Sequence, residues 1–158
     1  MPQMCPEDAL MRLHEIILNG KNRKLFTTLV LLDIKGASDN AWWPFILSLL
    51  RNANIPGNLF AVIYSFLKDR TATLSLGHYS KERHLQKGCP QGSISGPLLW
   101  NIIINYLFDK VSSFSSCETM AFSNDLLLCF QGKTLQNINT EAQRILDFLS
   151  SWAKTYKL

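Results

Sequence analysis

Apolar positions recur along the chain in two spacings, one typical of amphipathic helices and one typical of buried strands. The stretch Glu7–Asn19 has an apolar stripe at helical spacing, and Gly20 is expected to end that helix. The run Phe26–Leu32 is almost entirely apolar or β-branched, which predicts a central strand covered on both faces. Further helices are predicted over 44–52, 58–68, 98–110 and 134–156, and further strands over 71–76, 81–86, 120–122 and 126–130.

The order of these elements indicates the fold class. Strands and helices mix without a regular strand–helix–strand alternation, and no internal repeat or linker interrupts them. The pattern predicts an α+β fold in which a mainly antiparallel sheet packs on helices. A length of 158 residues suits one core, so residues 1–158 are expected to form a single domain.

Composition excludes several classes of protein. With 47% hydrophobic and 11% aromatic residues the chain is not disordered, yet no apolar run approaches the roughly 20 residues that cross a bilayer. No secretion signal opens the chain, and its four separated cysteines fit reduced thiols, so an intracellular protein is expected, nuclear or cytoplasmic. The net charge of +4 is compatible with a polyanionic partner without requiring one.

Two aspartates follow or separate apolar strands. Asp33 ends the first predicted strand, and Asp125 lies in a short turn between two others. Each alone is an ordinary strand terminator or turn residue. Together, carboxylates at adjacent strand ends can hold Mg²⁺, which prefers a few carboxylates, water and substrate phosphates. A pair of such ions would serve phosphoryl transfer.

A glycine-rich loop over Lys87–Gly96 is the second candidate. Its glycines would let the backbone approach a bulky ligand, and Gln91 could reach a base or a phosphate. The spacing is not that of a P-loop. The alternative is a plain connection that leads into the next helix.

Three segments, read in order, resemble motifs A, B and C of reverse transcriptases. They are Asp33-Ile34-Lys35-Gly36-Ala37, Cys89-Pro90-Gln91-Gly92 and Ala121-Phe122-Ser123-Asn124-Asp125-Leu126. The longer phrases DIKGASDNAWWPFIL, KGCPQGSISGPLLWNIIIN and ILDFLSSWA resemble the non-LTR (LINE-type) retrotransposon branch, especially its arthropod members. The resemblance extends from about Glu7 to Leu158.

This resemblance implies a palm-type sheet with part of the fingers, and an RNA-directed DNA polymerase as the parent activity. Asp33, Asp125 and the backbone carbonyl of Ile34 would hold the cofactor Mg²⁺. The implied partners are an RNA template, a DNA primer and deoxynucleoside triphosphates. The nucleotide pocket would be lined by Ile34, Lys35, Gly36, Ala37, Ser38, Gln91 and Gly92.

The sequence departs from the family pattern at three positions. Asn124 stands where motif C has its first catalytic aspartate, and a neutral amide cannot balance the charge of Mg²⁺, so the site is expected to be weakened. Ser38 stands where the family has Phe or Tyr against the sugar, so a surviving pocket should discriminate poorly against ribonucleotides. Tyr106 replaces a common Asp and is expected to alter only surface packing.

The ends differ from the family as well. The nucleotide-binding fingers motifs, the motif D lysine and the thumb are expected to be absent from this stretch of sequence. Without a thumb, much of the electrostatic grip on primer and template would be lost.

Three functions remain open at this stage. The first is a self-sufficient polymerase, and the second, which the departures favour, is a degenerate reverse transcriptase fragment without polymerase activity. The third is a non-catalytic module, adopted from the palm, that binds nucleic acid or protein through the former template face. Basic residues that support it are Lys21, Arg23, Lys24, Arg70, Lys81, Arg83 and Lys87.

Overall fold

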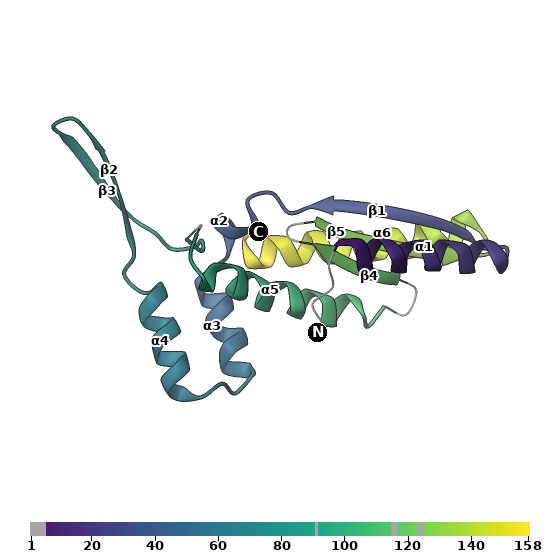
Figure 1. Ribbon diagram of the computed structural model, residues 1–158, viewed down its shortest axis with the longest axis horizontal. Coiled ribbons are helices and arrows are strands. Elements are labelled where there is room, and N and C mark those ends of the chain that lie inside the picture. The colour runs from purple at the N-terminus through teal and green to yellow at the C-terminus, as the bar shows by residue number, and fades with distance from the viewer. Residues whose placement is uncertain (1–5, 91, 115–116, 123–124) are drawn as a thin grey trace. The chain divides into compact units, whose positions relative to one another are not determined.

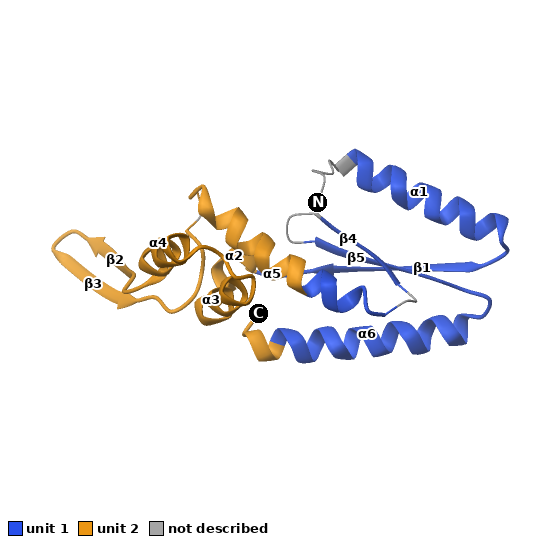
Figure 2. Cartoon of the chain, turned by 90° about the horizontal axis from the view of Figure 1, so that it is seen from below, with its two compact units in different colours: residues 1–35, 107–153 blue, residues 36–106, 154–158 orange. Residues whose placement is uncertain are grey.

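The computed structural model describes residues 6–90, 92–114, 117–122 and 125–158. The chain forms two compact units, which Figure 2 colours separately. The sheet unit comprises Met1–Lys35 and Leu107–Ala153, and the helical unit comprises Gly36–Tyr106 and Lys154–Leu158.

Helices and strands alternate irregularly along the chain (Figure 1). Their order is α1 (Pro6–Asn22), β1 (Phe26–Asp33), α2 (Ala37–Asn40), α3 (Trp43–Asn52), α4 (Gly57–Leu67), β2 (Thr71–Leu76), β3 (Tyr79–His84), α5 (Ser95–Val111), β4 (Cys117–Phe122), β5 (Asp125–Gly132) and α6 (Leu135–Tyr156). The antiparallel pairing and the packing on helices confirm the predicted α+β, palm-type fold class.

The sheet unit is built on an antiparallel sheet in the order β1-β5-β4. Helices α1 and α6 lie on opposite faces of it (Figure 2). Alternate residues of β5 point towards α6, and Leu126, Leu128 and Phe130 are at most 3% exposed there. The buried stripe of α6 that belongs to this unit consists of Ile138, Ala142, Ile145, Leu149 and Trp152.

The prediction that β1 is a central strand covered on both faces is wrong. In the described part of the chain β1 pairs with β5 alone, and the Leu31 side chain is 74% exposed. The central strand is β5, whose apolar run is shorter in the sequence. An apolar run shows that a strand is hydrophobic, but its neighbours in the sheet decide whether it is covered.

The end of the first helix also differs from its prediction. Gly20 lies inside α1, which continues to Asn22. A Cβ atom at position 20 would collide with the Gln131 side chain, whose Nε2 donates to the Ile16 carbonyl at 2.7 Å. Gly20 thus lies where α1 approaches β5 closely, and the helix ends two residues after it.

The helical unit contains α2, α3, α4, most of α5 and the β2–β3 hairpin. Its apolar core is formed mainly by α3 and α5, and includes Phe45, Ile46, Leu49, Leu50, Leu67, Leu99, Trp100, Ile103 and Ile104. Strand β2 spans the predicted residues, whereas β3 begins two residues earlier than predicted. A two-residue turn at Gly77–His78 pairs Leu76 directly with Tyr79 and so sets that register.

None of the described helices is long and apolar enough to cross a bilayer.

Candidate functional site

Two of the predicted site residues lie directly opposite each other in the sheet unit. Asp33 is the last residue of β1, Asp125 is the first residue of β5, and the two are paired in the antiparallel ladder. Directly paired residues project from the same face, with Cβ atoms about 5 Å apart. Both side chains are exposed, and within the described residues neither forms an ion pair.

Within the described residues, no ion pair neutralises the two carboxylates. Like charges directly across a ladder destabilise it, and a cation bound between the two carboxylates would relieve their repulsion. Mg²⁺ suits such a site because it is commonly bound by one or two carboxylates and keeps several waters. The adjacent Ile34 could add its carbonyl oxygen. Among the described residues no group of three or more metal-binding side chains occurs, and Asn124 lies outside the described residues.

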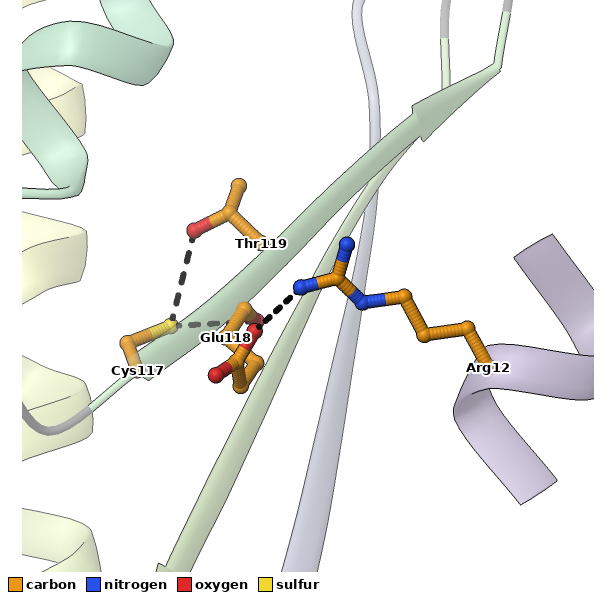
Figure 3. A network of polar contacts seen from close by, with 4 residues as sticks. All are labelled: Arg12, Cys117, Glu118 and Thr119. Carbon is orange, nitrogen blue, oxygen red and sulfur yellow. Dashed lines mark hydrogen bonds and ion pairs between the residues drawn. The ribbon is translucent and has the colours of Figure 1, made fainter. Parts of the chain in front are cut away.

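The face of the sheet that carries the two aspartates also packs against α1. Arg12 of α1 reaches Glu118 of β4 at 3.1 Å, as Figure 3 shows. Both side chains are more than half exposed, so this ion pair contributes little stability. The Cys117 thiol lies 3.5 Å from the Glu118 carbonyl oxygen and 3.9 Å from the Thr119 hydroxyl (Figure 3). The ion pair connects α1 to β4, whereas the Cys117 contacts stay within β4, and the four residues offer no catalytic arrangement.

The described cysteines are free thiols that burial keeps protonated. Burial raises the pKa of Cys129 to about 11, with smaller contributions from the neighbouring Cys117 and Glu118. Burial likewise raises the pKa of Cys89, although Arg70 opposes the shift, and the pKa of Cys117. Since the thiolate is the nucleophile, none of the three is suited to nucleophilic chemistry.

Within the helical unit, backbone hydrogen bonds join the motif B loop to the segment that follows motif A. The Cys89 amide donates to the Ser38 carbonyl at 2.7 Å, and the Gly88 amide donates to the Ala41 carbonyl at 2.8 Å. Trp42 and Lys87 form an isolated antiparallel bridge. The sequence also allowed this loop to be a plain connection. In the structure the loop is hydrogen-bonded to the segment that follows Asp33.

Side chains reinforce this junction, and sequence reasoning missed them. The Trp43 indole Nε1 donates to the Gly88 carbonyl at 2.8 Å, and the Lys87 Nζ donates to Asn40 Oδ1 at 2.6 Å. Gly88 has φ of 96°, and a Cβ there would lie 3.0 Å from the Asp39 carbonyl oxygen.

A cavity of about 350 Å³ lies at this junction. It brings together two predicted nucleotide-site residues, Ser38 and Gly92. Ser93 closes one side by donating to the Pro90 carbonyl at 2.8 Å and accepting from the Gly96 amide at 3.0 Å. The other lining residues are Cys89, Pro90, Ile94, Gly96 and Pro97.

The remaining predicted nucleotide-site residues are divided between the two units. Ile34 and the exposed Lys35 belong to the sheet unit with Asp33, whereas Gly36 begins the helical unit in a left-handed conformation, with φ of 64°. Ala37 is 1% exposed, so its side chain belongs to the core. Gln91 lies outside the described residues.

The sequence predicted that Tyr106 would alter only surface packing, but its ring takes part in an aromatic cluster. Its ring makes an edge contact with Phe45, with centroids 5.5 Å apart, and another with Tyr156 at 6.3 Å. Tyr156 in turn stacks on Phe45 at 3.6 Å. The three rings form one aromatic cluster in the helical unit. The sequence did not predict this cluster, because the three residues are far apart along the chain.

Comparison with known proteins identifies the family. Residues 3–158 match the family model described as reverse transcriptase (RNA-dependent DNA polymerase). The chain is 28% identical, over 94% of its length, to the 115 kDa protein of type-1 retrotransposable element R1DM from Drosophila melanogaster. It is 25% identical over 93% of its length to the RNA-directed DNA polymerase from mobile element jockey of the same species. A Pol polyprotein from element R1 of Nasonia vitripennis is 33% identical over 42% of the chain.

The chain spans only a small part of these curated relatives, 14% of the first and 17% of the second. The relatives confirm the predicted resemblance to non-LTR retrotransposons. The chain therefore belongs to the reverse transcriptase family.

Proposed function

We propose that this chain supplies the palm core of an RNA-directed DNA polymerase and that, as its sequence stands, it does not polymerise. The observation that carries the proposal is the direct pairing of Asp33 with Asp125, at the positions that match motifs A and C. Asn124 occupies the remaining motif C position, where the family has a carboxylate.

We expect the metal site to be weak because too few negative charges surround it. Asp33 and Asp125 together carry a charge of −2, which balances one Mg²⁺ but falls short of the +4 of two ions. When bound, paired Mg²⁺ ions activate the attacking oxygen and stabilise the leaving one in phosphoryl transfer. Loss of supporting groups around a metal commonly costs about 10- to 100-fold in affinity or activity. Replacement of a direct carboxylate ligand by Asn124 should cost at least as much.

The same proposal assigns roles to the loop residues. Ser38 and Gly92 line one cavity, and Gln91 lies between two residues of that lining in sequence. An incoming deoxynucleoside triphosphate would occupy this cavity. The macromolecular substrates would be an RNA template and a DNA primer. Ser38 is too small to exclude a 2′-hydroxyl, so the pocket would accept ribonucleotides as well.

Primer extension on an RNA template with Mg²⁺ tests the activity. The unmodified chain should incorporate no nucleotide, and the Asp33→Ala variant provides the background. Incorporation that Asp33→Ala abolishes would contradict the proposal. Metal affinity, measured by calorimetry, supplies a second readout: Asn124→Asp should bind Mg²⁺ at least about tenfold more tightly than the unmodified chain. Equal affinity would show that position 124 does not reach the metal.

A further inference from the structure

The β2–β3 hairpin is a two-stranded sheet that is open to solvent on both faces. Every residue of its two strands is exposed, and Figure 1 shows the hairpin extending away from α3 and α4. Within the described chain, β2 pairs with β3 alone. An isolated two-stranded hairpin is only marginally stable in water, and three or more strands are needed for independent stability. A further strand added to the hairpin would therefore stabilise it.

The outer edge of β2 presents backbone groups to solvent. The Leu85 amide donates to the Arg70 carbonyl at 2.8 Å, so these two residues form a hydrogen-bonded pair that continues the ladder. Such pairs alternate with non-hydrogen-bonded ones along antiparallel strands. The alternation directs the N–H and C=O groups of Thr71, Thr73 and Ser75 away from β3. An edge with outward backbone groups is available for pairing with another chain.

Charge distinguishes the two edges of the hairpin. β2 has the sequence Thr-Ala-Thr-Leu-Ser-Leu and carries no charge. β3 contains Lys81, Glu82 and Arg83, and charged side chains on an edge strand protect it against pairing with another chain. Two β3 strands paired with matching faces and greatest overlap would place Lys81 opposite Lys81 or opposite Arg83, which is repulsive. β2 is therefore the edge that a second strand can approach.

The side chains of β2 are complementary to those of a second copy of the same strand. In one antiparallel register, Leu74 lies opposite Leu74 of the second copy. Ala72 then faces Leu76 on the same side of the sheet, and on the other side Thr73 faces Ser75. Every pair joins two apolar or two hydroxyl side chains. The Leu74 pair is non-hydrogen-bonded, which brings the two side chains closest together.

We propose that two copies of this chain associate through their β2 edges, in antiparallel pairing about a twofold axis at Leu74. The product is a four-stranded sheet in the order β3-β2-β2-β3, whose charged outer strands oppose further growth. An edge without charge favours a second copy over a polyanion or an acidic segment. This interface goes beyond the proposed polymerase function and does not depend on it.

The alternative of stacking two hairpins face to face is less favourable. Lys81 pairs with Leu74, so it lies on the same face as the leucines. Arg83 lies on this face as well, because it pairs with Ala72. Stacking the apolar side chains of two copies would therefore bring their cations together. Edge pairing keeps the same cations on the outer strands.

Sedimentation equilibrium of the nuclease-treated full chain in EDTA, from low to high micromolar concentrations, tests the association. The average mass should rise from 18.0 kDa towards twice that value and no further. Thr73→Pro removes one outward amide from each copy and leaves the hydrogen bonds between β2 and β3 intact. Loss of two intermolecular hydrogen bonds should weaken the dimer about 10- to 100-fold.

The matched control for this variant is Ser80→Pro. Ser80 pairs with Ser75, so its amide also points outward, but from β3. The control should associate as the unmodified chain does. Asp33→Asn should do so too, which distinguishes a failure of this interface from a failure of the proposed polymerase function. Circular dichroism of each variant confirms that the fold is retained.

Disulfide crosslinking tests the register. Residues of a non-hydrogen-bonded pair have Cα atoms about 4.5 Å apart, within the range of a disulfide. Leu74→Cys should therefore give a covalent dimer under mild oxidation. Ser80→Cys is also exposed but should not crosslink, because the two β3 strands would lie about 14 Å apart. The unmodified chain gives the background from the native cysteines.

Several outcomes would overturn the proposal. They are a mass of 18.0 kDa at every concentration, equal weakening by Thr73→Pro and Ser80→Pro, and crosslinking of Leu74→Cys no greater than that of Ser80→Cys. A monomer at every concentration would leave the β2 edge to a strand of another protein. Growth beyond two copies would show that the charges of β3 do not protect its edge.

Discussion

Asp33 and Asp125 face each other across the β1–β5 ladder, ninety-two positions apart in the sequence, as the closing pair of that ladder. Neither residue alone distinguishes a metal site from a strand end. Their pairing places two negative charges on one face of the sheet, and we expect the repulsion between them to lower the stability of the metal-free chain.

Removal of either charge should stabilise the metal-free chain. Asp33→Asn or Asp125→Asn relieves a like-charge pair and should raise the free energy of unfolding in EDTA by a few tenths to about 1 kcal/mol. Mg²⁺ should stabilise the unmodified chain in proportion to its occupancy, and each variant should lose most of that response. Thermal unfolding with and without Mg²⁺ measures both effects.

The matched control is Asp109→Asn, an exposed aspartate of α5 in the same unit. It should leave the Mg²⁺ response unchanged. A response to Mg²⁺ that survives in the Asp33 and Asp125 variants would place the ion elsewhere.

Gly88 should be the least replaceable of the described loop glycines. An alanine there must adopt φ near 96° with its Cβ 3.0 Å from the Asp39 carbonyl oxygen, so Gly88→Ala should cost about 1–3 kcal/mol. Gly57→Ala is the control, because nothing lies within 4 Å of its added Cβ, and it should be neutral or slightly stabilising. Denaturant unfolding gives both values. Equal effects would mean that the loop adjusts freely.

Cys129 should react slowly in the native chain, because burial raises the pKa of its thiol. With a pKa of about 11 in place of 9.0, Cys129 carries about 100-fold less thiolate at pH 8, and its alkylation should accelerate only as the pH approaches 11. Iodoacetamide labelling followed by mass spectrometry of the native chain measures this. In guanidinium chloride Cys129 and Cys117 should react alike, and fast native labelling of Cys129 near pH 9 would contradict its burial.

Ser38 should control the choice of sugar. Ser38→Phe adds a ring to the wall of the 350 Å³ cavity, where it would meet a 2′-hydroxyl before a 2′-hydrogen. The variant should bind ATP more weakly than dATP, whereas the unmodified chain should bind the two alike, as measured by equilibrium dialysis. Ser48→Phe, on the exposed side of α3, controls for the added ring. Equal loss of both nucleotides in Ser38→Phe would mean that the cavity is simply blocked.

Local pattern predicted most elements because burial and periodicity act within a few residues. The helices corresponding to α1, α3, α4, α5 and α6 lie where apolar stripes placed them. The four-residue helix α2 was missed because one turn is too short to show a stripe. The position of β1 at the sheet edge was mispredicted, since strand order is a long-range property that an apolar run does not contain.

The candidate site was likewise predicted only in part from the sequence. Motif resemblance identified Asp33, Asp125, Ser38 and Gly92 as candidates, and the structure pairs the first two and places the other two on one cavity. Their roles as ligands remain predictions. The hydrogen bonds from Trp43 to Gly88 and from Lys87 to Asn40 could not be predicted, because each joins residues about 45 positions apart through side-chain geometry.

The sequence by itself determined the family, the fold class and the loss of a carboxylate at position 124, because these depend on the identity and order of residues. Only the tertiary structure decided which strand is central, that the aspartates are a ladder pair, and that β2 pairs with β3 alone within the described chain. The physical reason is that charge repulsion and ligand binding depend on distances in space, and chain folding brings those groups together from positions that the sequence keeps far apart.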